Sequence, residues 1–341
     1  MKSKPPLSDP SDVVHFQRKP WDSAFSVEGL FNNLRNEMNR QGVFPDVKVL
    51  PWSSKGLVNR LRSIAWAKRH QGKVNHITGD VHFLAIGLVR SKTILTVLDL
   101  EMLKRLKGWK RFIIKLFWFE IPFRYCKVVT VISDATKQEI LRLIRTRPPR
   151  IEVIPCVVDK QFQPMPRKFN QNCPRILQIG SGHNKNIERL VAALEGMNVH
   201  LHIVGRLSAS LERCLQSHKI QYSNAVGLTS SEILLAYQNS DILSFVSTEE
   251  GFGMPILEAQ WVERPVVTSN CSSMPEVAGD GAVLVDPYDI TSIRNGFQRL
   301  IADDKFRNEL VAKGRQNRAR FSIESVAAQY IALYQSLHHR G

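Results

Sequence analysis

Residues 247–259 read STEEGFGMPILEA, and they combine carboxylates with a glycine-rich turn. Glu250 stands directly before Gly251-Phe252-Gly253, and Glu258 follows in an apolar run that begins near Pro255. Ionised carboxylates accept hydrogen bonds, so this pair suits the hydroxyl groups of a sugar or a ribose. Glycines let the backbone approach a ligand closely, and a helix starting near Pro255 favours an anion at its N-terminus. The alternative is a polar loop followed by a helix with one surface glutamate.

A second segment, QIGSGHNKNIERL at residues 178–190, follows a candidate strand and opens a helix at Asn184 or Asn186. Its turn contains Gly180 and Lys185, and a lysine in this place offers a point charge to a diphosphate. Two glycines without a G-x-G-x-x-G or G-K-S/T order are weak evidence alone, and a solvated turn lysine is the alternative. A third segment, residues 268–287, places small hydroxyl residues and Pro275-Glu276 before a glycine-rich turn.

In order and spacing, these three segments resemble the donor domain of GT-B glycosyltransferases of family 4. The matching stretches are Gly180 with Lys185-Asn186, then AYQNSDILSFVSTEEGFGMPILEAQWVERPVVTS, then MPEVAGDGAVLVDP. The resemblance covers nearly all of residues 175–287. It implies a retaining enzyme that depends on a nucleotide sugar. One departure is the first loop, residues 20–31, which lacks the adjacent glycines that often bind donor phosphates in this family.

The resemblance also assigns roles to individual residues. Glu258 would hold the ribose hydroxyls, Glu250 would contact the donor sugar near the transferring carbon, and Lys185 would stabilise the leaving diphosphate. The donor-binding set it implies is Gly180, Lys185, Asn186, Glu250, Gly251, Phe252, Gly253 and Glu258.

On the acceptor side, the segments NHITGDVHFLA and TVLDLEML resemble the family's loops at strand ends. His82 and Asp99 are therefore candidate catalytic residues, although a single histidine is more often structural. The stretch Asp99-Leu100-Glu101 imitates a metal-binding D-x-D motif. Because this stretch follows a strand, we interpret it as part of a loop at the site. We expect neither a metal site nor a cofactor. The five cysteines are scattered and contain no C-x-x-C pair, which argues against a zinc site.

Short apolar runs alternate with helical patterns along the whole chain, which predicts parallel sheets covered on both faces. The predicted strands are residues 13–16, 47–52, 74–78, 93–98, 128–133, 151–155, 175–181, 200–205, 222–227, 242–247, 265–269 and 282–286. The fold class is therefore α/β, with two Rossmann-like doubly wound domains facing a central cleft, as in GT-B. Residues 1–160 would bind the acceptor, 161–174 would be a linker and 175–319 would bind the donor. A helix within 320–341 would cross back to the first domain.

The formal net charge is +16, and all of the excess lies in residues 1–150, which suggests an anionic partner for that half. Residues 103–127 mix eight basic residues with Trp, Phe and one acid, Glu120. This mixture suits an interfacial helix on an anionic membrane, and the alternative is an aromatic face packed on the sheet. Without a signal peptide or an apolar span, we expect a cytoplasmic protein, peripheral on the inner membrane face.

The leading hypothesis is a retaining hexosyltransferase that uses a nucleotide-diphosphate sugar and a glycan or lipid-linked glycan acceptor. Bacterial cell-surface polysaccharide synthesis (O-antigen, capsule or exopolysaccharide) is the expected context. One alternative is a nucleotide-sugar epimerase or hydrolase of the same architecture. The other is a nucleic-acid-binding protein, but no zinc finger or RNA-recognition signature supports it, so no nucleic acid is expected. The sequence leaves open the base, the sugar, the acceptor and the oligomeric state.

Overall fold

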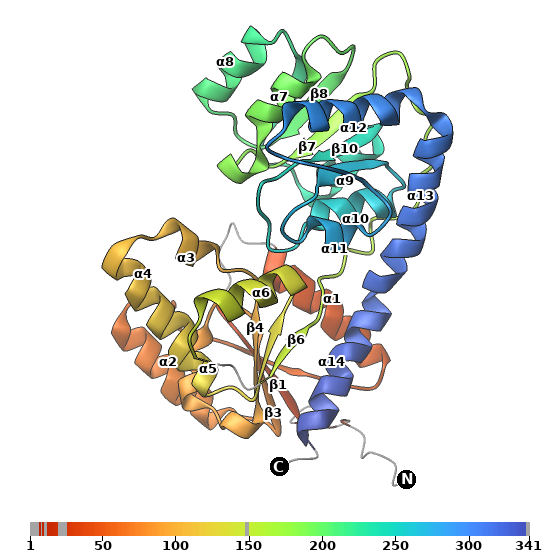
Figure 1. The fold of residues 1–341 in the computed structure, drawn as a ribbon. Coiled ribbons are helices and arrows are strands. Elements are labelled where there is room, and N and C mark those ends of the chain that lie inside the picture. The colour runs from red at the N-terminus through yellow and green to blue at the C-terminus, as the bar shows by residue number, and fades with distance from the viewer. Residues whose placement is uncertain (1–6, 8, 10–11, 20–25, 147–149, 339–341) are drawn as a thin grey trace. The chain divides into compact units, whose positions relative to one another are not determined.

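The computed structural model describes residues 7, 9, 12–19, 26–146 and 150–338 (Figure 1). Part of the first loop discussed above, residues 20–25, lies outside them. The chain divides into two compact units, one made of residues 1–157 with 322–341 and the other of residues 158–321. The segment predicted as a linker, 161–174, belongs to the second unit, where Phe169 packs against the core and Asn170 N donates to Asp241 Oδ1 at 3.2 Å.

The first unit contains a parallel sheet in the order β2-β1-β3-β4-β5-β6. Its strands are β1 (Val13–Gln17), β2 (Asp46–Val49), β3 (Val74–Ile77), β4 (Thr93–Val97), β5 (Val128–Val131) and β6 (Ile151–Val153). Its helices are α1 (Ser26–Arg40), α2 (Leu57–Arg69), α3 (Glu101–Arg105), α4 (Gly108–Ile114), α5 (Ile121–Arg124), α6 (Asp134–Leu143) and α14 (Ile323–His338). A π-helical segment, Lys115–Glu120, joins α4 to α5, and short 3-10 helices span His82–Gly87 and Arg90–Lys92.

The second unit contains a parallel sheet in the order β12-β11-β10-β7-β8-β9. Its strands are β7 (Arg175–Ile179), β8 (His200–Val204), β9 (Gln221–Ala225), β10 (Ile242–Phe245), β11 (Val266–Ser269) and β12 (Val283–Val285). Its helices are α7 (Ile187–Leu194), α8 (Ala209–Ser217), α9 (Ser230–Gln238), α10 (Met254–Trp261), α11 (Met274–Ala278), α12 (Ile290–Ala302) and α13 (Asp304–Arg318). Short 3-10 helices span His183–Lys185 and Ala319–Phe321.

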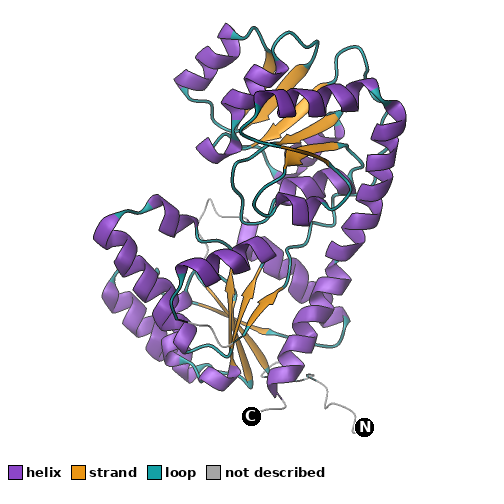
Figure 2. Ribbon diagram, viewed as in Figure 1, coloured by secondary structure: helices purple, strands orange, loops and turns teal. Residues whose placement is uncertain are grey.

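Helices lie on both faces of each sheet (Figure 2), which explains why the strands are apolar without alternation. In β4, for example, Leu95 and Val97 pack into one core of the first unit, while Ile94 packs into the other. Successive side chains of a strand point to opposite faces, so apolar residues predominate on both sides of a strand between two cores, and buried polar ones such as Thr96 are hydrogen-bonded. Each of the twelve predicted strands is present, and the predicted α/β class is confirmed. Among the described helices, none is long and apolar enough to cross a bilayer.

The helix α14 packs against α1 and β3 through a buried polar chain. The hydroxyl of Tyr334 pairs with His15 Nε2 at 3.0 Å and with His76 Nδ1 at 2.8 Å, and His76 Nε2 pairs with Thr96 Oγ1 at 2.7 Å. Both histidines and the tyrosine are fully buried. Because buried polar groups are costly unless they are hydrogen-bonded, this chain fixes one arrangement of α14 on the sheet.

The two buried histidines should make stability depend on pH. Burial lowers the pKa of His76 to about 3 and lowers the pKa of His15 as well. In the unfolded chain a histidine takes up a proton near pH 6.5, so stability should fall as the pH drops below that value. His76→Asn should reduce this slope by about 1.4 kcal/mol per pH unit between pH 6 and 5, measured by urea unfolding. The exposed His183→Asn is the control, and an equal slope in wild type and His76→Asn would contradict the expectation.

Candidate active site

The strand order of the second sheet reverses between β7 and β10, which are hydrogen-bonded neighbours. The chain leaves β7 toward β8 on one side, and it leaves β10 toward β11 on the other side. The two loops that follow these strands therefore diverge from one point at the carboxyl edge. Such a switch point is where open α/β sheets bind their ligands. The predicted donor segments, 180–186 and 247–253, are these two loops.

An ion pair joins the two loops. Lys185 Nζ lies 2.5 Å from Glu250 Oε1, and the two side chains are only 18% and 15% exposed. Asn184 Nδ2 donates to the same Glu250 oxygen at 3.3 Å and to the carbonyl oxygen of Glu249 at 3.0 Å. The ammonium of Lys185 also lies 4.5 Å from the ring centre of Phe245. The predicted cation and carboxylate thus share one partly sheltered place, where a cation can meet a phosphate and a carboxylate can meet a sugar hydroxyl.

Two glycines make this geometry possible. Gly180 has φ +83, and a Cβ atom there would lie 2.9 Å from Lys185 Cε. A side chain at position 180 would therefore be strained and would push the lysine away. Gly253 has φ +111 and stands at the N-cap of α10, directly before Met254 and Pro255.

The loop that carries Glu250 is held by two serines that sequence reasoning did not single out. Ser272 Oγ accepts from Glu250 N at 3.2 Å and donates to Glu250 O at 2.7 Å. Ser273 Oγ donates to Phe252 O at 2.7 Å. The signal was present as the hydroxyl-rich stretch in residues 268–273, but only the fold shows which backbone groups it meets. The side chain of Phe252 is buried and packs edge-on against Phe321.

Asn186, predicted to contact the donor, is buried and adopts a left-handed conformation at φ 59. Its amide nitrogen donates to Val246 O at 3.1 Å and to Pro287 O at 2.7 Å, and its Oδ1 accepts from Arg189 Nη1 at 2.8 Å. These bonds tie the two loops together behind Lys185. They give Asn186 a positioning role, and its direct contact with a donor stays a prediction.

Glu258 is the fifth residue of α10, which begins at Met254, so it lies in the second turn of the helix. Its Oε2 accepts a hydrogen bond from Tyr237 Oη at 2.5 Å. Desolvation raises the pKa of Glu258 to about 7, although the bond from Tyr237 opposes this rise. Tyr237 is fully buried, and burial followed by the charge of Glu258 raises its own pKa. Sequence reasoning missed Tyr237, because nothing local links α9 to α10.

The two acceptor-side candidates lie in the first unit. His82 is buried, and its Nδ1 pairs with Trp118 O at 2.8 Å. Burial lowers the pKa of His82 to about 4, although the bond to Trp118 opposes this effect. These contacts describe a packed histidine and do not favour the predicted catalytic role. Asp99 is exposed and its Oδ1 accepts from Glu101 N at 2.9 Å, which is a turn contact that leaves its predicted role untested.

No three His, Cys, Asp or Glu side chains of the described residues gather in a way that would hold a metal ion. The site instead offers the ammonium group of Lys185 paired with the carboxylate of Glu250, and α10, which follows the second loop, carries the carboxylate of Glu258. The beginnings of α7 and α10 follow the same two loops, and each helix N-terminus adds partial positive charge there. The arrangement can therefore bind a phosphorylated ligand with hydroxyl groups.

Known proteins match both the second unit and the whole fold. Residues 159–317 match the family model described as "Glycosyl transferases group 1". The O-antigen chain mannosyltransferase B of Escherichia coli is 27% identical over 237 residues, which cover 62% of this chain and 61% of that protein. The MMP alpha-(1->4)-mannosyltransferase of Mycolicibacterium hassiacum is 29% identical over 219 residues, which cover 60% of this chain and 53% of that protein. The alignments thus span little more than half of each relative's length.

Among solved structures, the sucrose-phosphate synthase of Thermosynechococcus elongatus matches with a TM-score of 0.73. The match covers 98% of both chains at 18% sequence identity, and it therefore shows the fold alone. Residues 159–317 thus match the glycosyl transferases group 1 family, in a chain whose fold is GT-B.

Proposed function

We propose that this protein is a retaining glycosyltransferase that transfers a hexose from a nucleotide-diphosphate sugar to a glycan or lipid-linked glycan. The observation that carries the proposal is the Lys185–Glu250 ion pair at the switch point. Glu258 and Tyr237 follow on α10 and α9 of the same unit. The match of residues 159–317 to glycosyl transferases group 1 supports the same reaction class.

In the proposed reaction the bond between the anomeric carbon and the diphosphate oxygen breaks, and a bond from that carbon to an acceptor oxygen forms. The proton of the acceptor hydroxyl passes to the departing phosphate oxygen on the same face of the sugar. Negative charge grows on the diphosphate as it leaves, and Lys185 with the N-terminus of α10 stabilises it. Glu250 would orient the sugar hydroxyls, and Glu258 would accept hydrogen bonds from the ribose. This route assigns no role to a metal ion or a cofactor.

The acceptor and the sugar are proposed from the relatives. Two of them are mannosyltransferases, one of which acts on the O-antigen chain by its name, so mannose is the first sugar to test. We place the reaction in the synthesis of a cell-surface polysaccharide such as O-antigen, capsule or exopolysaccharide. The basic, aromatic segment 103–127 supports a peripheral position on the inner face of the membrane.

The ion pair provides the first test. Lys185→Gln and Glu250→Gln should each lower kcat for sugar transfer, or for donor hydrolysis without an acceptor, by about 100-fold or more. The reason is that Lys185→Gln removes the charge that stabilises the leaving diphosphate, and Glu250→Gln removes the carboxylate that orients the sugar. Glu249→Gln is the matched control, because it changes the same charge at the next position and should keep most of the activity. Full activity in both site variants, with unchanged folding by circular dichroism, would refute the assignment. Release of free sugar that no glycan acceptor accelerates would favour a hydrolase.

The Glu258–Tyr237 pair provides a second test through pH. Ribose hydroxyls donate best to an ionised carboxylate, so the affinity for a nucleotide sugar should rise as the pH passes through about 7, the pKa of Glu258. Tyr237→Phe removes a hydrogen bond to the ionised form, so the midpoint should move to higher pH. Glu258→Gln should bind weakly and without this pH dependence. Titration calorimetry with a nucleotide sugar is the measurement, because its diphosphate has no second ionisation in this range. A wild-type profile that is flat from pH 6 to 8 would argue against ribose contact by Glu258.

A further inference from the structure

The segment 103–127 does not bury all of its aromatic side chains. Trp118, Phe119 and Phe123 belong to the core of the first unit. Trp109, Phe112 and Phe117 remain 69%, 66% and 51% exposed. Phe117, Trp118 and Phe119 are consecutive residues of the π-helical segment Lys115–Glu120, whereas Trp109 and Phe112 lie on α4 before it. Core packing is therefore confirmed for three of these residues, and the interfacial interpretation stays a prediction for the exposed ones.

The exposed apolar residues of α4 form one face. Trp109, Phe112 and Ile113 are spaced i, i+3 and i+4, so they lie on the same side of the helix. A second apolar face lies on α2, where Leu57, Val58 and Leu61 are 73%, 61% and 57% exposed. The guanidinium of Arg60 on α2 lies 4.9 Å from the Trp118 ring and 5.8 Å from the Phe83 ring, which links α2 to the π-helical segment. Two linked elements thus turn apolar side chains toward solvent, which is unusual for a face without a partner.

Cations accompany this face. Lys107, Lys110 and Arg111 are exposed, and within the described part of the chain no carboxylate pairs with them. Lys110 Nζ lies 5.9 Å from the ring centre of Trp109. Exposed aromatic rings beside unpaired cations suit the surface of an anionic bilayer, because the rings enter the interface and the cations contact the headgroups. A protein partner would have to present carboxylates to these cations and apolar side chains to these rings at matching positions.

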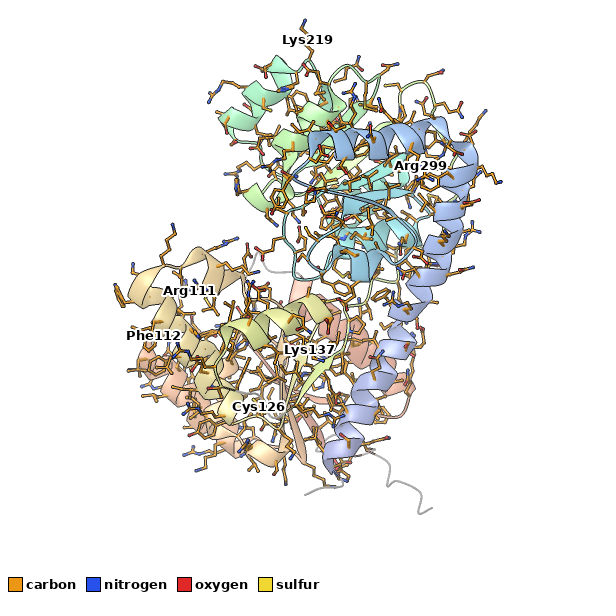
Figure 3. All side chains as sticks on the ribbon, viewed as in Figure 1. Arg111, Phe112, Cys126, Lys137, Lys219 and Arg299 are labelled. Atoms are coloured by element: carbon orange, nitrogen blue, oxygen red, sulfur yellow. The ribbon has the colours of Figure 1, made fainter. Side chains whose placement is uncertain are left out.

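A pocket of about 210 Å³ opens beside α4, lined by Leu103, Gly108, Arg111, Phe112, Lys115 and Leu143. Figure 3 labels Arg111 and Phe112 on this helix. Three of the lining residues are apolar, and two are cations, of which Lys115 lies 3.4 Å from Glu120 and Arg111 has no such partner. The pocket is smaller than a site for a whole metabolite, which usually takes at least about 300 Å³. Its lining is mainly apolar, so it suits the first part of an acyl chain, with Arg111 and Lys115 at its wall to meet the phosphate of the same lipid.

We propose that α2 and α4 form a docking surface for an anionic phospholipid bilayer, and that the Arg111–Lys115 pocket seats the phosphate of one lipid. Trp109 and Phe112 enter the interface beside it. The inference does not depend on the proposed sugar transfer, and it identifies where the protein would meet a lipid-linked acceptor.

The test is co-sedimentation of the full chain with vesicles. Wild type should bind vesicles of phosphatidylcholine with phosphatidylglycerol, and it should bind pure phosphatidylcholine at least about tenfold more weakly. The double variant Arg111→Gln with Lys115→Gln should lose about 30-fold in affinity, because each cation at an anionic surface adds about a factor of five. The double variant Lys305→Gln with Lys313→Gln removes two exposed lysines from α13 of the other unit and should bind like wild type. Trp109→Ala with Phe112→Ala should also bind at least about tenfold more weakly.

Three results would overturn the proposal. The first is an equal loss of vesicle affinity in the Arg111→Gln with Lys115→Gln variant and in the α13 control, which would show that only the net charge matters. The second is equal binding of wild type to vesicles charged with phosphatidylglycerol and to vesicles charged equally with oleate, which would remove the phosphate site. The third is a wild-type dimer that Trp109→Ala with Phe112→Ala converts to a monomer in sedimentation velocity, which would make the face an interface between copies. Sugar transfer to a water-soluble acceptor reports separately on the proposed function.

Discussion

The ion pair between Lys185 and Glu250 is the interaction on which the site depends, because it joins two loops that arise from distant parts of the sequence. The reversal of strand order between β7 and β10 creates the space for it, and Gly180 leaves room for the lysine. Each charge of this sheltered pair holds the other in place, so both are available to a ligand that contacts both. A phosphorylated sugar is such a ligand, since its phosphates attract the ammonium group and its hydroxyls donate to the carboxylate.

The second carboxylate works under a different constraint. Glu258 lies on α10 beside the buried Tyr237 of α9, and desolvation makes its charge costly and raises its pKa to about 7, although the hydrogen bond from Tyr237 opposes this rise. A carboxylate in this state gains more from hydroxyl donors than a solvated one, because a ligand restores the hydrogen bonds that burial removed. The apolar face of α10 provides this environment and also fixes the position of the side chain.

Much of this architecture could be predicted from the sequence, because its causes are local. Strands between two cores are mostly apolar, and the roles of Lys185, Glu250 and Glu258 come from the resemblance of their segments to a known family. The contacts of Ser272, Asn184 and Tyr237 could not be predicted, since each crosses between segments far apart in the chain. The hydrogen bond of His82 Nδ1 with Trp118 O could not be predicted for the same reason, and the catalytic role of His82 stays a prediction. The division of the aromatic residues in 103–127 into buried and exposed side chains was not predictable either, because it depends on which of them face the core of the first unit.

The central claim is that the carboxyl edge of the second sheet binds a nucleotide-diphosphate sugar. A thermal-shift series of nucleoside diphosphates and nucleotide sugars, recorded on wild type and on Lys185→Gln with Glu258→Gln, tests it most directly. We expect one base to stabilise wild type by about 2.7 kcal/mol at a hundred times its Kd, and the double variant to show no shift at the same concentration. An unchanged shift in the double variant, or the absence of a shift with every nucleotide, would contradict the claim.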